Sequence, residues 1–231
     1  MNRGIQNVLL EEISSMPFAR FGALAITNEL ERIALELADR LEEEGYVSCP
    51  VPAFRYYDYI EGRPLFSHKH AAVAAGLGHL GWGGFLVTPK FGGAVQLCSV
   101  LTSAKLIPDQ ILEKNLCDKC MECVKICPSG AISRTSTESF RINGQKYSHG
   151  RISKIRCMWA CGGLQKKNTY SWSDVPRPPV KNEEDLALAH SEFMRGEIMR
   201  NEWQKHMAGQ FRLIFCSKCY LTCHPEEKNQ T

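Results

Sequence analysis

The sequence lacks any long hydrophobic run and any strong excess of one charge. Its most apolar stretch, residues 71–87, holds several glycines and lies between Lys69 and Lys90, which is unlike a membrane span. The formal net charge is only +3, and no row of Lys and Arg follows one face. We therefore expect neither a membrane span nor a nucleic-acid partner.

The N-terminal segment also lacks an apolar signal region and a twin-arginine pair, so the expected compartment is the cytoplasm. Cysteines in a reducing compartment rarely form disulfides. This chain nevertheless has 11 cysteines among its 231 residues. Dense cysteine in such a setting indicates metal binding or catalysis.

The hydrophobic pattern predicts a chain of α+β class with its main boundary near Pro108. Residues Glu29–Glu44 repeat apolar side chains at helical spacing, and Asn28 and Gly45 are the expected N-cap and C-cap. Asn143-Gly144 predicts a type I′ turn in a hairpin over residues 139–147. We expect an α/β part over residues 1–108 and a cluster-binding part over residues 109–231.

The most informative motif reads C-x2-C-x2-C-x3-C-P and consists of Cys117, Cys120, Cys123, Cys127 and Pro128. Two intervening residues allow a tight loop to place successive thiolates on neighbouring irons of one 4Fe–4S cube. The fourth cysteine of such a run binds a second cluster. Zinc is disfavoured, because its four thiolates usually come as two separated pairs.

A second group, C-x2-C-x3-C-H-P, repeats the last three cysteines of that motif as Cys216, Cys219 and Cys223. Leu213 stands where a first cysteine would fall, so a ligand must come from elsewhere. The expected first cluster takes Cys117, Cys120, Cys123 and Cys223. The expected second cluster takes Cys127, Cys216, Cys219 and one of Cys157, which we favour, or Cys161. The alternative is a zinc or redox C-x-x-C that ignores the first motif.

Three other residues of these types have simpler expected roles. Cys49 and Cys98 stand alone in the sequence, so we expect small buried hydrophobes rather than ligands. His224 is expected to pack or hydrogen-bond near a cluster.

These cysteines, with Arg156-Cys157 between the two groups, resemble those of epoxyqueuosine reductases and corrinoid-dependent reductive dehalogenases. Residues 76–81, the following Leu86-Val87-Thr88-Pro89, and residues 66–72 are similar to the same group. The resemblance covers roughly Glu29 to Pro225 and indicates a short, N-terminally reduced member. It implies a reductase-like α/β core, a ferredoxin-like module with two 4Fe–4S clusters, and Cys157 as the interposed ligand.

The resemblance also implies a cobalamin lodged against the cluster-binding part, with the nearer cluster reducing its cobalt. Epoxyqueuosine reductases carry Arg-Asp-Tyr-His, in which the Asp is the acid, before the helix that matches Glu29–Glu44. Here the corresponding residues, Ala25-Ile26-Thr27-Asn28, include no acid. Cobalamin binding and epoxyqueuosine reduction are therefore left open.

Three further sets of residues are candidates for a site outside the clusters. The first set offers proton donors, or else an aromatic loop that packs against the core: Tyr56, Tyr57, Asp58 and Tyr59. The second could bind an anionic or cofactor group, or else cap a helix: His68 and His70, with Lys69 between them. The third permits close backbone approach to a flat ligand, or else forms a tight turn: Gly76, Gly78 and Gly81.

Two functions remain in competition at this point. The first is a reductase that passes electrons through two clusters to a corrinoid or directly to a substrate. The second is a ferredoxin-like electron carrier that docks a partner enzyme, and a third reading makes the clusters purely structural. A ferredoxin-type or flavodoxin-type donor, or a partner enzyme, is the expected redox partner. A homo-oligomer is left open.

Overall fold

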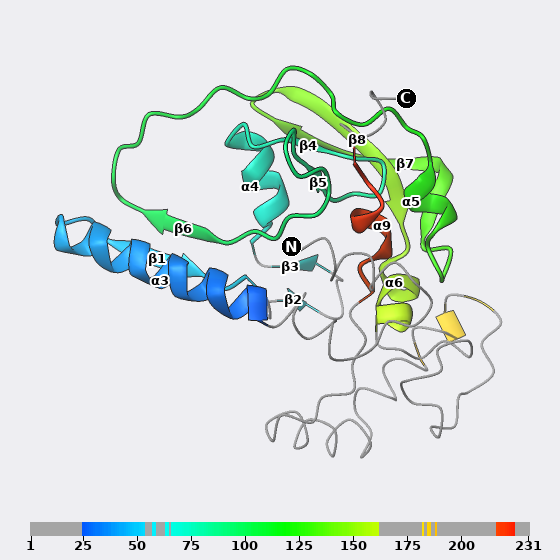
Figure 1. Cartoon of the computed structure of the whole chain (residues 1–231), viewed down its shortest axis with the longest axis horizontal. Coiled ribbons are helices and arrows are strands. Elements are labelled where there is room, and N and C mark those ends of the chain that lie inside the picture. Colours follow the sequence, from blue (N-terminus) through cyan, green and yellow to red (C-terminus); the bar gives the residue numbers. More distant parts are fainter. Residues whose placement is uncertain are drawn as a thin grey trace, which may run out of the picture.

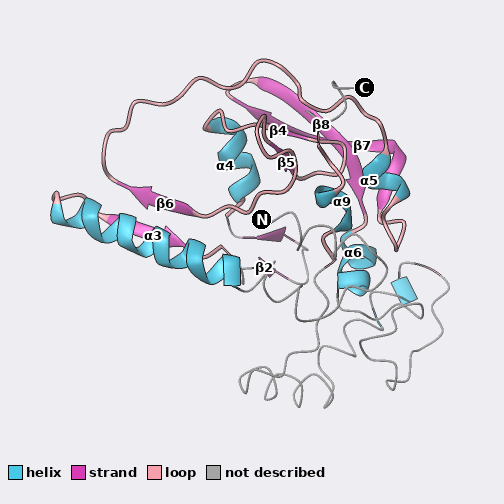
Figure 2. Ribbon diagram, viewed as in Figure 1, coloured by secondary structure: helices cyan, strands magenta, loops and turns pink. Residues whose placement is uncertain are grey.

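The computed structural model describes residues 25–53, 57–58, 63–64, 66–161, 182, 184–185, 188 and 216–224. In this part of the chain, helices are combined with strands that pair two by two, all antiparallel (Figure 2). The pairs are β1 (Ser48–Val51) with β6 (Ser99–Thr102), β2 (Tyr57–Asp58) with β3 (Arg63–Pro64), β4 (His79–Leu80) with β5 (Leu86–Val87), and β7 (Ile132–Ile142) with β8 (Gln145–Ile152).

The structure therefore mixes helix and sheet, as the α+β expectation requires. A reductase-like α/β core within residues 1–108 is not confirmed, because the described strands there form only antiparallel two-stranded sheets. Among the described helices, none combines the length and apolar character that crossing a membrane would need.

Helix α3, Ile26–Glu43, lies along β1 and β6 (Figure 1). It buries Ala34 and Ala38 against the sheet, because small side chains on one stripe let the helix approach closely. Its N-terminus differs from the prediction: the helix begins before Asn28, which therefore cannot be the N-cap. The C-terminal prediction is off by one residue: Glu44 is the C-cap, and Gly45 follows it in the left-handed conformation with φ +89°.

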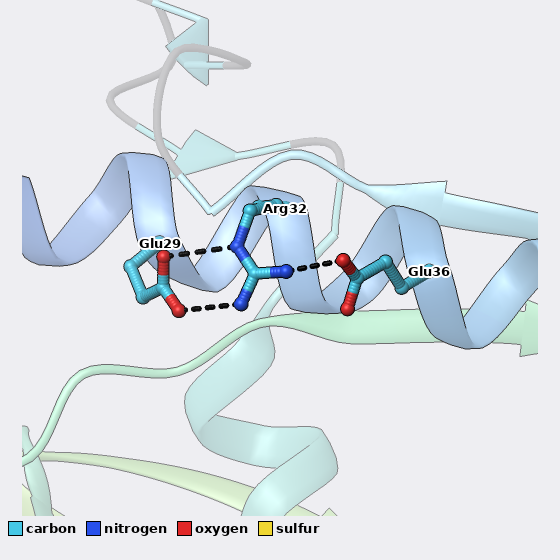
Figure 3. Close-up of polar contacts among 3 residues, drawn as sticks. All are labelled: Glu29, Arg32 and Glu36. Atoms are coloured by element: carbon cyan, nitrogen blue, oxygen red, sulfur yellow. Dashed lines mark hydrogen bonds and ion pairs between the residues drawn. The ribbon is translucent and has the colours of Figure 1, made fainter.

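The outer face of α3 carries an ion-paired row of side chains (Figure 3). Arg32 donates to both carboxylate oxygens of Glu29 and also pairs with Glu36, one turn further on. All three side chains are more than half exposed, so solvent screens these pairs and they add little to stability. These pairs support the helix locally.

The hydrophobic core is shared between the two halves of the chain. Val73 of helix α4 (His68–Ala74) and Leu86 of β5 are almost fully buried, and Tyr147 of β8 packs in the same cluster. Core residues thus come from both sides of position 108. The division into residues 1–108 and 109–231 stays a prediction.

The β7–β8 hairpin turns at Asn143 and Gly144, whose φ angles are +48° and +79°. Positive φ at both central residues is the property of a type I′ turn, so the sequence prediction is confirmed. Helices α5 (Glu122–Lys125), α6 (Lys154–Cys161) and α9 (Lys218–Leu221) gather near the base of this hairpin (Figure 1).

Candidate metal centre

The first cysteine motif forms a loop whose turns are fixed by side chains inside the loop itself. The Asn115 carboxamide oxygen accepts the backbone N–H of Cys117 at 3.0 Å. The Asp118 carboxylate accepts the N–H of Cys120 at the same distance. Each is a short Asx turn, which explains why polar residues stand two positions before a cysteine.

Two residues of this loop take the left-handed conformation. Lys119 has φ +57° and Met121 has φ +63°. Alternation of right-handed and left-handed backbone turns successive N–H groups to one side, and such nests hold anions, iron–sulfur centres among them. The strain at two non-glycine residues is therefore consistent with a loop built to surround a group.

A cavity of about 570 Å³ opens inside this loop. It is lined by Cys117, Cys120 and Cys123 together with Cys223, which comes from the far end of the described chain. These are the four residues that the spacing predicts for the first cluster. His224 lines the same cavity, which is consistent with its expected place beside a cluster.

Backbone N–H groups also reach two of the sulfur atoms. The N–H of Trp82 donates to Sγ of Cys117 at 3.2 Å, and the N–H of Ala131 donates to Sγ of Cys127 at 3.3 Å. Hydrogen bonds of this kind stabilise sulfur that carries negative charge. One sulfur of each predicted ligand set is thus provided with a donor.

The remaining cysteines form a second group beside the first. Burial raises the pKa of the Cys219 thiol, and four other thiols raise it further: those of Cys216, Cys157, Cys127 and Cys123. Burial likewise raises the pKa of Cys216, and the thiols of Cys157 and Cys127 raise it further. The four thiols of the predicted second set are therefore close enough to influence one another's pKa. Cys123, which belongs to the first set, also raises the pKa of Cys219.

Cys157 and Cys161 are the two candidates for the fourth ligand of the second cluster. Both lie on α6, one helical turn apart, but the side chain of Cys161 lies outside the described residues. Cys157 raises the pKa of both Cys216 and Cys219, as expected of thiols that lie close together in one ligand set. Its assignment stays a prediction.

The donor set fits a 4Fe–4S cluster rather than a single ion. Among the described residues, no three His, Cys, Asp or Glu side chains converge closely enough to hold one ion. Four thiols instead surround a cavity with N–H groups nearby. Burial, with Cys117 and Cys120, raises the pKa of Cys123 to about 11, so a bound metal would have to displace its proton.

The candidate proton donors lie largely outside the described residues. Tyr57 and Asp58 form β2, but their side chains lie outside the described part of the structure. Tyr56 and Tyr59 lie outside it entirely. Their role as proton donors stays a prediction.

The two histidines next to Lys69 have protein partners. Nδ1 of His68 lies 2.8 Å from the Ser99 hydroxyl, and its Nε2 donates to the Pro52 carbonyl at 3.0 Å. Nδ1 of His70 lies 2.6 Å from the hydroxyl of Ser67, the residue that precedes α4. Both rings thus connect the start of α4 to neighbouring segments, although neither is a side-chain cap of the helix. Their role in binding an anionic or cofactor group stays a prediction.

Two of the three candidate glycines make room for the protein's own backbone. A Cβ at Gly76 would lie 2.2 Å from the carbonyl oxygen of Gln110, and one at Gly78 would lie 2.2 Å from that of Val87. Gly81 differs, because it lines the cavity near Cys117. The first two therefore favour the tight-turn alternative.

Cys49 corrects one expectation, because it is exposed rather than buried. It lies in the two-stranded β1–β6 sheet, too thin to cover both faces. Cys98 is half-buried, and the pKa of its thiol is raised by that burial.

Sequence reasoning did not single out Trp82, Ala131 or Gly93. Trp82 and Ala131 act through backbone N–H groups, which carry no residue-type signal. Gly93 is needed because a Cβ there would lie 2.4 Å from the Tyr220 carbonyl oxygen. Only the fold brings these partners together.

Comparison with known proteins gives the same picture. A family model described as a 4Fe-4S binding domain matches residues 111–133. An epoxyqueuosine reductase from Bacillus anthracis is 33% identical over 99 residues, 42% of this chain and 26% of that protein. No solved structure matches the chain significantly.

Tetrachloroethene reductive dehalogenases match as well. The enzyme from Sulfurospirillum multivorans is 40% identical over 37% of this chain and 17% of its own length. That from Desulfitobacterium hafniense is 30% identical over 64% of this chain and 28% of its own length. The matched segment thus spans less than a third of each of these relatives. The resemblance seen in the motifs is confirmed: the chain contains a 4Fe-4S binding domain and is similar, over part of its length, to epoxyqueuosine reductases and reductive dehalogenases.

Proposed function

We propose that this chain is an oxidoreductase that passes single electrons through two 4Fe–4S clusters to a corrinoid or directly to a substrate. The observation that carries the proposal is the meeting of Cys223 with Cys117, Cys120 and Cys123 around one cavity. A shared cluster explains why a cysteine about a hundred residues further along the chain faces this loop.

The proposed ligands of the second cluster are Cys127, Cys157, Cys216 and Cys219. Because Cys127 belongs to the first motif and Cys223 to the last, each motif gives one ligand to the other's cluster. The electrostatic contact between Cys123 and Cys219 supports neighbouring clusters. When bound, such clusters supply one-electron transfer at potentials tuned by hydrogen bonds and solvent.

The protein's own groups hold and tune these sites. The left-handed residues Lys119 and Met121 shape the loop, and Trp82 and Ala131 donate hydrogen bonds to sulfur. The names of the relatives, epoxyqueuosine reductase and tetrachloroethene reductive dehalogenase, support a reductase. The motif resemblance to corrinoid-dependent reductive dehalogenases makes cobalamin the proposed acceptor where the electrons pass through a corrinoid.

A second candidate function is electron transfer to a partner enzyme without a catalytic site in this chain. One observation favours it: Cys120 is exposed, with exposed Lys114 and Lys119 on the same cavity. A cluster beside an exposed thiolate with lysines at its edge is accessible to an acidic redox partner.

Cluster content and ligand sharing are the first test. Anaerobically reconstituted protein should hold about eight irons and eight sulfides per chain, as two 4Fe–4S clusters require. Cys117→Ser and Cys223→Ser should remove the same paramagnetic signal, and Cys127→Ser and Cys219→Ser the other. The matched control is Cys49→Ser, which changes an exposed cysteine outside both groups.

The proposal of two clusters fails if the protein holds fewer than about five irons. It also fails if Cys127→Ser and Cys223→Ser leave both signals intact. Titration with hydroxocobalamin, followed by absorption, then tests the corrinoid-dependent form of the reductase against the carrier. Tight binding with a base-off spectrum supports the reductase, whereas clusters that cycle without any interaction support the carrier.

A further inference from the structure

Trp82 is held in place by three hydrogen bonds to three different segments. Its backbone N–H donates to Sγ of Cys117 at 3.2 Å. Its carbonyl accepts the N–H of Gly150 at 2.9 Å, and its indole Nε1–H donates to the Ser133 carbonyl at 2.9 Å. Gly150 belongs to β8 and Ser133 to β7, so both strands of the hairpin hold the residue whose N–H reaches the cysteine.

The indole ring of Trp82 packs closely against β8. A Cβ at Gly150 would lie 2.6 Å from Nε1 of Trp82, so only glycine leaves room for the ring at this point of β8. The ammonium of Lys119 also lies 5.8 Å from the centroid of the ring. Lys119 is part of the loop between Cys117 and Cys120, and its charge interacts favourably with the ring face.

The turn that carries Trp82 is held at its other end as well. The Lys69 ammonium donates to the Gly84 carbonyl at 2.7 Å, and the N–H of Gly84 donates to the Gly81 carbonyl at 2.9 Å. Burial lowers the pKa of Lys69, which is consistent with an ammonium placed inside the fold to hold this turn. The N–H of Trp82 therefore has little freedom to move away from the sulfur.

We propose that Trp82 is a positioning residue: its indole, anchored on the hairpin, holds its own backbone N–H against Cys117 and so raises the reduction potential of the first cluster. This inference rests on the proposed function, because it requires Cys117 to bind a cluster. A hydrogen bond to a cluster sulfur favours the more negative, reduced state, and its loss lowers the potential. The hairpin thus becomes part of the redox centre although it contributes no ligand.

Trp82→Phe tests the proposal, since it keeps an aromatic ring and removes the anchor to Ser133. Both cluster signals are followed during a redox titration of the reconstituted protein. The signal that Cys117→Ser abolishes should shift to lower potential, and the other should stay in place. Gly150→Ala, which pushes a methyl group against Nε1, should shift the same signal in the same direction.

The matched control is Phe140→Leu, which removes an aromatic ring of the same hairpin that stacks on Tyr147 instead. It should leave both potentials unchanged. Equal shifts of both signals in Trp82→Phe, or no shift, overturn the inference. So does a shift of the first signal in Phe140→Leu as large as that in Trp82→Phe.

A measurement on the unmutated protein keeps the test valid if a variant fails to fold. Protein labelled with ¹⁵N-tryptophan should show, by pulsed EPR, a nitrogen coupling on the first cluster through the Trp82 N–H. Absence of that coupling overturns the inference even if two clusters are present. An iron content below two clusters instead contradicts the proposed function, so the two failures are distinguishable.

Discussion

The backbone N–H of Gly93 donates a 2.9 Å hydrogen bond to the carbonyl oxygen of Cys223. This bond attaches the last cysteine to the glycine-rich segment that precedes β6. A Cβ at Gly93 would lie 2.4 Å from the carbonyl oxygen of Tyr220, so the two segments approach as closely as backbones can. This contact holds the backbone of Cys223 next to the cavity that this residue lines.

Gly93→Ala should therefore move Cys223 away from the cavity and empty the first cluster. We expect iron to fall by about half, because one of two 4Fe–4S clusters loses a ligand. The measurement is iron and sulfide content after anaerobic reconstitution. Gly45→Ala is the control: its Cβ meets nothing within 4 Å, and its positive φ costs only local strain. Full iron content in Gly93→Ala would show that the contact is dispensable.

Leu221 lies between Cys219 and Cys223 and is fully buried. Leu221→Ala leaves a cavity, and we expect it to lower the free energy of unfolding by about 2–5 kcal/mol. Leu101→Ala, at a side chain that is 51% exposed, should change it by less than about 0.5 kcal/mol. Denaturant unfolding of the anaerobic holoprotein, followed by circular dichroism, compares the two. Similar midpoints for both variants would mean that α9 is not part of the cooperative fold.

The pH dependence of stability should report on His70. Burial, and then the nearby Lys69 and His149, lowers the pKa of His70 below the usual 6.5. The folded state thus prefers the neutral ring, so this stability is complete above pH 6.5 and is lost as pH falls through the lowered pKa. His70→Gln should show a shallower loss of unfolding free energy below pH 6.5 than the parent protein. Parallel curves for the two proteins would rule out this contribution.

Charge at the cavity edge should control electron delivery. Lys119 is exposed and belongs to the first cysteine loop. Lys119→Glu should slow reduction by an acidic ferredoxin or flavodoxin about tenfold at low salt, and the difference should shrink as salt is added. The control, Lys146→Glu, makes the same change at an exposed position near the hairpin turn. Stopped-flow reduction rates provide the measurement, and equal slowing by both variants would indicate a non-specific charge effect.

Local structure was the part most accessible from the sequence. The type I′ turn at Asn143-Gly144 and the end of α3 just before Gly45 both followed from residue types that tolerate positive φ. The prediction that α3 begins after Asn28 was wrong, because the preference of an Asn side chain for capping is weak when packing extends the helix further. Residues 76 and 78 suggested a ligand site, whereas the structure fills the space beside them with backbone.

The spacing of the cysteines by itself determined the kind of centre, because two intervening residues fix how far apart neighbouring thiolates can lie in a short loop. It also predicted which thiols should be grouped. Tertiary structure alone decided that Gly93 anchors the last group, that both strands of the hairpin hold Trp82, and that the core crosses position 108. Those relations depend on close contact between segments far apart in the chain, and residue spacing carries no record of which surfaces will meet.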